Sequence, residues 1–503
     1  MSPELAIILS LCVPLVGGAA ILLFDRHPNL RETATLVTAA ALFLIVASIY
    51  PHVTRGELPE VTLFDVLPGL SLTFQVEPLG MMFGLIASFL WIITSVYAIG
   101  YMRGHHEKHQ TRFYFFFAVA ISSAMGVAFA GNMLTLFICY EVLTLSTFPL
   151  VTHAGSEQAK RAGRTYLGIL IGTSIAFQLL AVVWTWTVAG TLDFRPGGIL
   201  DGRASDAVIL VLMVLYIYGI GKAALMPFHR WLPAAMVAPT PVSALLHAVA
   251  VVKAGVFTVI KVIVYIFGLD TLSAIAGSDW LIYVAGFTII VASAIALRQD
   301  NLKARLAYST VSQLSYVIIA AAMLVPESIT GAAMHVTAHA FGKITLFFCA
   351  GAIMVASHKT QVSQLRGIGR RMPWTMTAFA IGALSMIGLP PTAGFVSKWY
   401  IVQGALASDQ MFVLAVIVAS TLLNAAYFLP IIYAAFLQKE DPPHAGGGHG
   451  GGHGGGHDGG RGHGEAPLAS VLALTLTAAG TVLLFVFPET ALELARQLAE
   501  IAR

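Results

Sequence analysis

The stretch GIGKAALMPFHRWLP, residues 219–233, decides the fold. An apolar run over residues 208–220 leads into Lys222, and Pro227 follows five residues later. Proline lacks a backbone N–H and breaks or kinks a helix, so the pattern predicts a helix that stops early within the membrane. An ionisable side chain at that depth indicates a functional site, although a lysine can also extend its ammonium to the interface. The stretch alone leaves both interpretations of Lys222 open.

The composition is that of a polytopic membrane protein. The 503 residues are 57% hydrophobic and 11% charged, with a mean hydropathy of +0.81, whereas soluble domains have about 25% charged residues. The net charge of +3 says nothing about nucleic acid. Residues 1–24 lack the basic start of a secretory signal and are interpreted as a retained first transmembrane helix. The three cysteines lie in separate apolar segments, which excludes a disulfide framework or a cysteine metal cluster.

Apolar runs long enough to cross a bilayer recur along the chain. A helix needs about 20 apolar residues to do so. The sequence therefore predicts an all-α polytopic protein with about fourteen transmembrane helices, near residues 5–24, 33–50, 79–100, 113–130, 133–152, 165–189, 207–226, 242–268, 280–297, 305–324, 329–356, 374–407, 411–436 and 467–487.

The charges in the loops alternate in sign along the chain. With the N-terminus outside, the inside loops contain basic residues such as Arg103, Lys160 and Arg370, and the outside loops are mainly acidic, with Arg55, Arg195 and Arg203 as exceptions. This is the positive-inside pattern. It predicts that both termini lie outside the cytoplasmic membrane of a bacterial cell.

Residues 440–466 differ from the rest of the chain in composition. They are rich in glycine and cannot bury a core, so they are interpreted as a disordered cytoplasmic spacer. Weak metal binding is the alternative, through His444, His449, His453, His457 and His463. The run HHEKH at 105–109 is likewise interpreted as a polar inside loop rather than a metal site.

Two predicted helices are interrupted in corresponding places. Pro227 follows Lys222, and GLPPTAG at 388–394 precedes Lys398. Each interruption falls in the fourth span of a five-span block, 113–268 or 280–436, and an odd number of spans gives the two blocks opposite orientations. Paired broken helices in inverted halves indicate a transport site.

The predicted division into regions follows from this pattern. It comprises three N-terminal helices in 1–112, five-helix repeats in 113–268 and 269–436, the His/Gly-rich loop in 437–466, and a last helix with a tail in 467–503.

Glu141 is the charged residue in the middle of the predicted span over 132–151. A charge at the centre of a membrane helix costs about 2.5–3.5 kcal/mol on insertion scales, which favours a function. A protonated carboxyl, or one paired only for packing, is the alternative.

Three further basic residues share the span 242–268. Lys253 is in mid-span with apolar neighbours on both sides, which favours a function. His247 is either functional or bonded to a backbone carbonyl. Lys261, near the outer end, is interpreted as a lysine whose ammonium extends to the interface.

His335, His339 and Lys343 recur at a spacing of four and lie on one helix face. A histidine titrates near neutral pH, so the pattern favours a proton path. A zinc site is disfavoured because a third ligand and the glutamate of a zinc protease are missing. Histidines bonded to neighbouring helices are the other alternative.

Two further lysines adjoin these groups. Lys398 follows the second interruption and is interpreted as functional, with extension toward the interface as the alternative. Lys303 is a candidate for the inner port of a proton path.

Together these residues predict a row of titratable groups through both blocks, here called the polar row: Glu141, Lys222, His247, Lys253, His335, His339, Lys343 and Lys398. An apolar environment makes an ammonium release its proton more readily, and a nearby carboxylate makes it keep the proton. A lysine that alternates between such partners is a proton switch.

At these residues the chain resembles the antiporter-like family, which comprises subunits of Mrp-type sodium/proton antiporters and proton-pumping membrane-arm subunits of respiratory NADH:quinone oxidoreductase. Its length and VKAG stretch most resemble the D-type subunits of the Mrp antiporters. The matching pieces are YE at 140–141, GKAA at 221–224, PFH at 227–229, WLP at 231–233, APTPVSALLH at 238–247, VKAG at 252–255, DNLKARLAYST at 300–310, His335, His339, Lys343, GLPP at 388–391, GF at 394–395 and Lys398.

The resemblance implies fourteen helices with two inverted five-helix repeats, each containing a broken helix. It implies that Glu141 pairs with Lys222. It also implies that the path continues to Lys398 through Lys253, His335, His339 and Lys343, and that the chain works in a complex with other membrane subunits.

The function that follows is proton translocation coupled to sodium export in an Mrp-type antiporter, as a transporter subunit rather than an enzyme. The sequence has no cofactor-binding motif or redox cysteine cluster, so no cofactor or metal is expected and any redox chemistry belongs to another subunit. The alternatives are a pump subunit of NADH:quinone oxidoreductase, of a membrane-bound hydrogenase or of a bicarbonate-uptake complex, an inert scaffold, and a metalloenzyme that uses His335 and His339.

Overall fold

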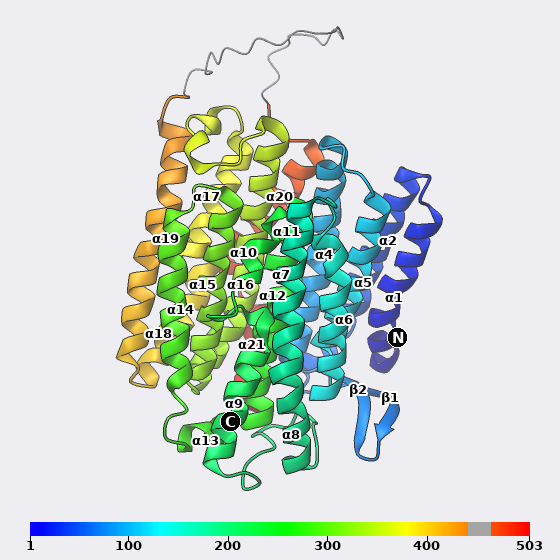
Figure 1. Ribbon diagram of the computed structural model, residues 1–503, viewed down its shortest axis with the longest axis vertical. Coiled ribbons are helices and arrows are strands. Elements are labelled where there is room, and N and C mark those ends of the chain that lie inside the picture. The colour runs from blue at the N-terminus through cyan, green and yellow to red at the C-terminus, as the bar shows by residue number, and fades with distance from the viewer. Residues whose placement is uncertain (441–463, 503) are drawn as a thin grey trace.

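The computed structural model of the protein describes residues 1–440 and 464–502, in which long helices lie side by side along one direction (Figure 1). The helices of the N-terminal half are α1 Pro3–Leu23, α2 Pro28–Ala47, α3 Tyr50–Thr54, α4 Pro78–Gly104, α5 Gln110–Ala128, α6 Met133–Val151, α7 Glu157–Thr173, α8 Leu180–Ala189, α9 Asp206–Gly219, α10 Trp231–Ala234, α11 Thr240–Ala244 and α12 Val251–Lys261. Those of the C-terminal half are α13 Leu269–Ala274, α14 Trp280–Arg298, α15 Leu302–Ala322, α16 Pro326–Ser357, α17 Pro373–Ile387, α18 Ala393–Ala407, α19 Met411–Leu437, α20 Leu468–Val486 and α21 Glu489–Ile501.

Shorter segments of other helix types connect or extend these helices. Three are π-helical turns, whose backbone hydrogen bonds span five residues instead of the four of an α-helix: η1 Ser174–Leu179, η4 Leu245–Val249 and η5 Val262–Phe267. Four are 3₁₀ turns: η2 Gly221–Ala223, η3 Ala235–Val237, η6 Val362–Gln364 and η7 Ile368–Arg370.

Each of the fourteen predicted spans contains a helix, and the multi-pass fold is confirmed. Within the described residues, eleven helical runs are long and apolar enough to cross a membrane. The other three predicted spans correspond to α9, to α15 and to the pair α17 and α18. Two of these spans consist of shorter helices, because the chain breaks after α9 and between α17 and α18, as the prolines predict. The third, α15, has a lower hydropathy because it contains Lys303, Arg305 and several hydroxyl side chains.

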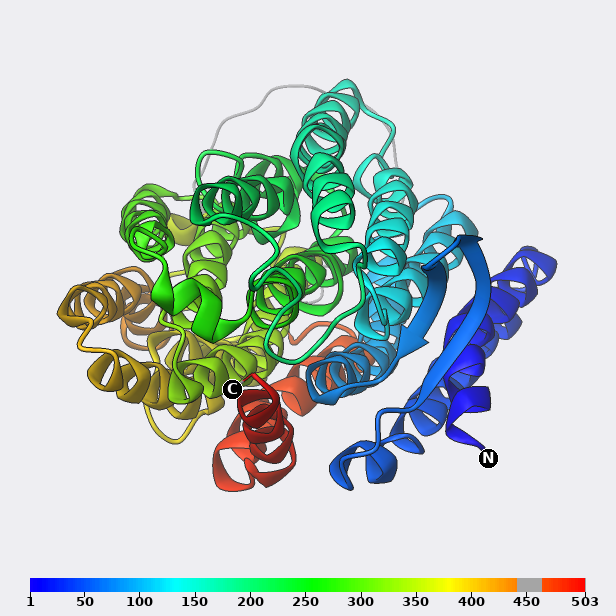
Figure 2. The same ribbon diagram turned by 90° about the horizontal axis from the view of Figure 1, so that it is seen from below.

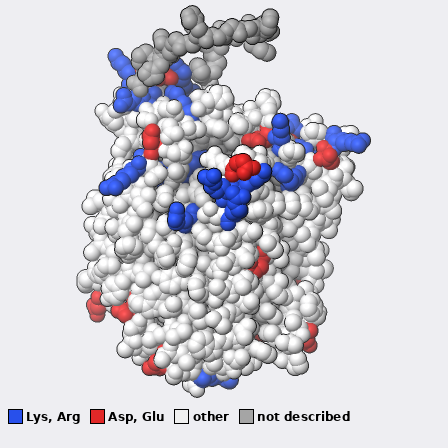
Figure 3. All heavy atoms as spheres, in the orientation of Figure 1, with Lys and Arg blue, Asp and Glu red and all other residues white. Residues whose placement is uncertain are grey.

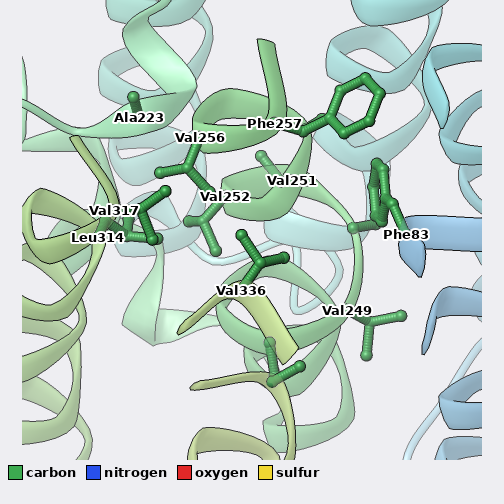
Figure 4. Packing of buried hydrophobic residues seen from close by; sticks show 14 of the residues in the cluster. Phe83, Ala223, Val249, Val251, Val252, Val256, Phe257, Leu314, Val317 and Val336 are labelled. Atoms are coloured by element: carbon green, nitrogen blue, oxygen red, sulfur yellow. The ribbon is translucent and has the colours of Figure 1, made fainter. Parts of the chain in front are cut away.

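The run from α11 to η5, residues 240–267, lies at the centre of the molecule and is buried along its most apolar stretch. Figure 4 shows valines of α12 packed among side chains of four neighbouring segments. The labelled neighbours are Phe83 of α4, Ala223 of η2, Leu314 and Val317 of α15, and Val336 of α16. The helix that carries Lys253 is therefore enclosed by protein rather than lipid.

Two elements were not predicted from the sequence. The all-α expectation missed an antiparallel hairpin of β1, Glu60–Leu67, and β2, Leu70–Gln75, which lies beside the N-terminal helices (Figure 2). The predicted C-terminal tail forms the amphipathic helix α21, whose apolar side packs on α4 and α16. Hydropathy detected neither because both are too short or too polar for a membrane span.

The two ends of the bundle differ in charge. Figure 3 shows most of the visible Lys and Arg side chains toward one end, here called the basic end, and mainly acidic side chains at the opposite end. The hairpin and both chain ends lie away from the basic end (Figures 1 and 2). The metal-binding and spacer interpretations of the histidines in 440–466 fall on residues 441–463, which lie outside the described residues.

Lys261 does not extend to an interface, so that interpretation is wrong. Its Nζ lies 3.2 Å from Oε1 of Glu77, and the two side chains are 1% and 4% exposed. Glu77 also accepts from the Tyr265 hydroxyl at 3.0 Å and from the backbone N–H groups of Leu79 and Gly80, so it caps α4. This buried ion pair joins α4 to α12.

We expect Glu77→Gln to destabilise the protein by about 3–5 kcal/mol, because it leaves the Lys261 ammonium buried without its counter-charge. Thermal unfolding of the purified protein in detergent measures the change. Adding Lys261→Met to Glu77→Gln should restore part of the stability. The exposed pair of Glu157 and Lys160 is the control, since Glu157→Gln should change stability by less than about 1 kcal/mol. An equal effect of both Glu→Gln changes would contradict the prediction.

Candidate functional site

The first interruption follows the course that the sequence predicts. α9 ends at Gly219, η2 covers Gly221–Ala223, and helical structure resumes at Trp231. Ala224 has a φ of 55°, which turns the chain out of the helix direction. The Trp231 indole N–H donates to the Gly221 carbonyl at 2.9 Å, so this unwound backbone has a protein partner despite its depth. Lys222 thus lies on a 3₁₀ turn inside the bundle, at the point where the α-helix is interrupted.

The Lys222 side chain points at α6 and is fully buried. Its Nζ donates to the Tyr140 carbonyl at 2.8 Å and to the Thr144 hydroxyl at 2.5 Å. The same atom lies 3.0 Å from the centre of the Tyr140 ring, a cation–π arrangement. Three features of α6 therefore hold the ammonium, and none of them has a formal charge.

The direct pair of Glu141 and Lys222 that the resemblance implies is absent from the ion pairs of the described residues. Both carboxylate oxygens of Glu141 are buried and have no hydrogen-bond partner there. Tyr140 and Thr144 lie on the side of α6 toward Lys222, and Glu141 follows Tyr140 one residue later on the helix without contacting the lysine. The helical turn places Glu141 within electrostatic range of Lys222 but not in contact with it.

Lys253 and His339 join the two predicted blocks. The Lys253 Nζ on α12 lies 2.5 Å from Nδ1 of His339 on α16, and both side chains are buried. Nε2 of His339 has no partner among the described residues. A proton that the lysine releases can pass directly to this ring, which can release it again from its other nitrogen.

His335 lies one helical turn from His339, with ring centres 6.2 Å apart. Its Nδ1 is 2.9 Å from the Ser397 hydroxyl and its Nε2 is 3.0 Å from Oε1 of Gln313. These contacts extend the polar row from α16 to α15 and α18.

Two lysines continue the row in the second block. Lys343 donates to the Ser309 hydroxyl at 2.8 Å. Lys398 donates to the carbonyls of Met386 and Ile387 at 3.1 and 2.9 Å, at the C-terminus of α17, where the helix dipole favours a cation. The two interruptions are therefore not equivalent in detail, since Lys222 binds a neighbouring helix and Lys398 binds the end of the half-helix before its own.

Gly388, at the end of α17, has a φ of 90°, and a Cβ there would meet Cδ of Lys398 at 2.6 Å. A glycine at this position both allows the turn and leaves room for the lysine.

His247 lies on η4, with its ring 4.7 Å from that of Phe347. Neither ring nitrogen has a partner among the described residues, so the backbone-bonded alternative is not what this structure shows. Lys343 and Lys303 are both within electrostatic range of the ring.

No group of three His, Cys, Asp or Glu side chains suited to a metal occurs within residues 1–440 and 464–502. His335 and His339 contact Ser397, Gln313 and Lys253 instead of converging on one point. This geometry does not fit the metalloenzyme alternative.

The partners of the polar row were missed in the sequence. Tyr140, Thr144, Ser309, Gln313 and Ser397 are neutral, and such residues are ordinary in membrane helices. Only Gln313 could have been recognised as a partner from the sequence, because it is an amide in the middle of the predicted span 305–324. The hydroxyl residues gave none, since only their orientation distinguishes them.

Gly255 sets the distance between α12 and the segment that carries Lys222. A Cβ on Gly255 would lie 2.4 Å from the backbone nitrogen of Ala223 and 2.4 Å from the carbonyl carbon of Lys222. We expect Gly255→Ala to push η2 away, to destabilise the protein by about 1–3 kcal/mol, and to lower transport by moving Lys222. Thermal unfolding and transport by membrane vesicles measure the two effects.

The matched control is Gly168→Ala on α7, where a Cβ would meet nothing within 4 Å. This change should leave transport unaltered and should not destabilise the helix, since alanine is the better helix former by about 1 kcal/mol. Native transport by Gly255→Ala would show that this close approach is unimportant.

Comparison with known proteins gives consistent results. Residues 130–424 match the family described as NADH:quinone oxidoreductase/Mrp antiporter, TM. The chain is similar to NADH-quinone oxidoreductase subunit N of Desulforudis audaxviator, with 32% identity over 87% of this chain and 88% of that one. It is also similar to the D-type subunit of the Na(+)/H(+) antiporter of Alkalihalophilus pseudofirmus, with 23% identity over 86% of each chain. A chain of the Mrp complex from Dietzia sp. has the same fold, with a TM-score of 0.86 and 22% identity over 99% of this chain and 97% of that chain.

Proposed function

Because the chain belongs to the family of transmembrane subunits of NADH:quinone oxidoreductases and Mrp antiporters, we propose that it translocates protons in a multisubunit sodium/proton antiporter. The observation that carries this proposal is the 2.5 Å contact of Lys253 with His339, which links titratable groups of the two halves deep inside the bundle. The similarity to a D-type antiporter subunit over 86% of its length supports the Mrp assignment.

We place the proton path along the polar row, with Lys222 as a switch. In the described conformation its ammonium binds Tyr140 and Thr144. Movement of its flexible stem toward Glu141 or toward Lys253 would alternately favour and disfavour the proton. Glu141 then acts electrostatically, and His335, His339, Lys343 and Lys398 relay the proton in the second half.

The regional assignment is part of the same proposal. Inverted repeats in 113–268 and 269–436 are supported by the breaks after α9 and after α17. A cytoplasmic basic end, with both termini outside a bacterial cytoplasmic membrane, is supported by the separation of charge in Figure 3. Other membrane subunits complete the assembly, as the named relatives are themselves subunits.

A redox-driven pump subunit is the second candidate, since the relative at 32% identity is a subunit of NADH-quinone oxidoreductase. Dye fluorescence in everted vesicles that contain the native assembly separates the two. Addition of Na⁺ should release protons from acidified vesicles and reverse the quenching of a pH dye. A response to NADH with none to Na⁺ would replace the antiporter with the pump, and a response to neither would refute both.

A further inference from the structure

A cavity of about 300 Å³ opens at the basic end, where several segments of the chain meet. Tyr101 and His105 line it from the end of α4, Glu107 from the following loop, Thr240 from α11, Lys303 from α15, and Lys359 from the loop after α16. The proton path proposed above does not include this cavity.

The cavity has a defined wall. The backbone N–H of Leu302 donates to the Thr360 carbonyl at 2.9 Å, and that of Val362 donates to the Asp300 carbonyl at 2.7 Å. Asp300 also accepts from the backbone and the hydroxyl of Ser363 at 2.9 and 2.8 Å. The start of α15 is thus fastened to the loop after α16, and this keeps Lys303 and Lys359 on the same cavity.

Lys303 lies where the cavity meets the interior. Its Nζ donates to the carbonyl of Ala238, in the segment between η3 and α11, at 2.6 Å. It also lies within electrostatic range of His247, whose two ring nitrogens have no partner among the described residues. Buried polar atoms of this kind are normally satisfied by protein or by ordered water, and no described protein group is available here. Lys303 therefore lines the cavity and lies within electrostatic range of His247, a member of the polar row.

Glu107 is the one carboxylate among the described residues that line the cavity. Its Oε1 lies 3.0 Å from Nδ1 of His105, and the two side chains are 20% and 39% exposed. Glu107 is within electrostatic range of Lys303, Tyr101 and His153. A partly exposed carboxylate that lies beside a histidine and lines the cavity is placed to pass protons between the cavity and bulk water.

We propose that this cavity is the inner port of the proton path and that Glu107, paired with His105, releases to solution the protons that leave through it. During sodium export the ammonium of Lys303 gives a proton through the cavity to the carboxylate of Glu107, and the carboxyl that forms gives the proton to bulk water. The neutral Lys303 then receives its next proton from the side of His247. This inference rests on the proposed function, because it assigns a port to that same path.

The test uses Glu107→Ala in the complete assembly, in everted vesicles whose cytoplasmic face meets the bath. At near-neutral bath pH and low buffer concentration, sodium-driven proton release should fall about tenfold, because the port loses the carboxylate that passes protons to the bath. High concentrations of a membrane-impermeant buffer should restore most of the rate, since mobile buffer then takes protons from Lys303. Glu107→Asp, which keeps the carboxylate, should remain close to the native rate.

Glu157→Ala is the matched control, an exposed glutamate of the basic end that pairs with Lys160 and does not line the cavity. It should transport normally at every buffer concentration. A native transport rate of Glu107→Ala at low buffer concentration would contradict the role of Glu107 in the port. A loss of transport that buffer does not restore would also contradict it, because such a loss indicates a packing defect. If either occurs while Lys222→Ala still abolishes native transport, the port alone is wrong. An assembly that moves no protons at all would refute the proposed function and the port together.

Discussion

Lys222→Ala is expected to abolish proton transport while the protein remains folded. The change removes the titratable group at the first break, and loss of a proton-transferring group typically lowers a rate by about 100-fold or more. Folding should survive because the hydroxyl of Thr144 also donates to the Tyr140 carbonyl, at 3.1 Å, and the Trp231 indole still holds the Gly221 carbonyl. Sodium-dependent dye fluorescence in everted vesicles measures transport, and the amount of assembled complex in the membrane measures folding.

Two variants separate proton exchange from packing at this position. Lys222→Arg keeps a positive charge that is not released in proteins, so it should be as inactive as Lys222→Ala. Lys160→Ala removes an exposed lysine of α7 and should transport normally. Substantial transport by Lys222→Arg would show that a fixed charge is sufficient and that Lys222 is not a switch.

Lys253→Met is expected to reduce transport by a comparable factor, about 100-fold or more. Methionine fills a similar apolar volume, so packing of the enclosed helix should persist. The change removes the 2.5 Å contact with His339 and with it the direct link between the halves. The same vesicle assay measures the result.

His339→Gln tests the other side of this contact. Glutamine can accept a hydrogen bond from Lys253 but does not titrate, so transport should be lost although the contact persists. Lys160→Met is the matched control for the lysine change. If both Lys253→Met and His339→Gln keep the native rate, protons do not cross between the halves at this point.

Much of the fold was predictable because the bilayer restricts what a sequence can do. A span must be helical and continuously apolar, so hydropathy located the helices, and the prolines located both breaks. The titratable residues of the polar row were predictable for the same reason, since charges are rare in such runs. All eight belong to helices or breaks that the structure places within the bundle.

The partners of these residues could not be predicted, because they depend on tertiary contacts that hydropathy does not detect. The family resemblance implied Glu141 as the partner of Lys222, but the rotation of α6 brings Tyr140 and Thr144 to it instead. The pairing of Lys261 with Glu77 required two residues far apart in the chain to meet at the start of α4. Neutral partners such as Gln313 and Ser397 become recognisable only when the facing helix is known.

The π-helical turns on either side of α12 have a further consequence. Each residue of an α-helix turns the chain by about 100°, so a helix with one residue fewer at η4 would present Lys253 to a different neighbour and away from His339. The direction of this side chain is therefore set by how many residues separate Thr240 from Val251, whatever their identities. The number of residues in this segment thus fixes the direction of Lys253, and deletion of a single apolar residue here would turn Lys253 away from His339 and disconnect the two halves without removing any titratable group.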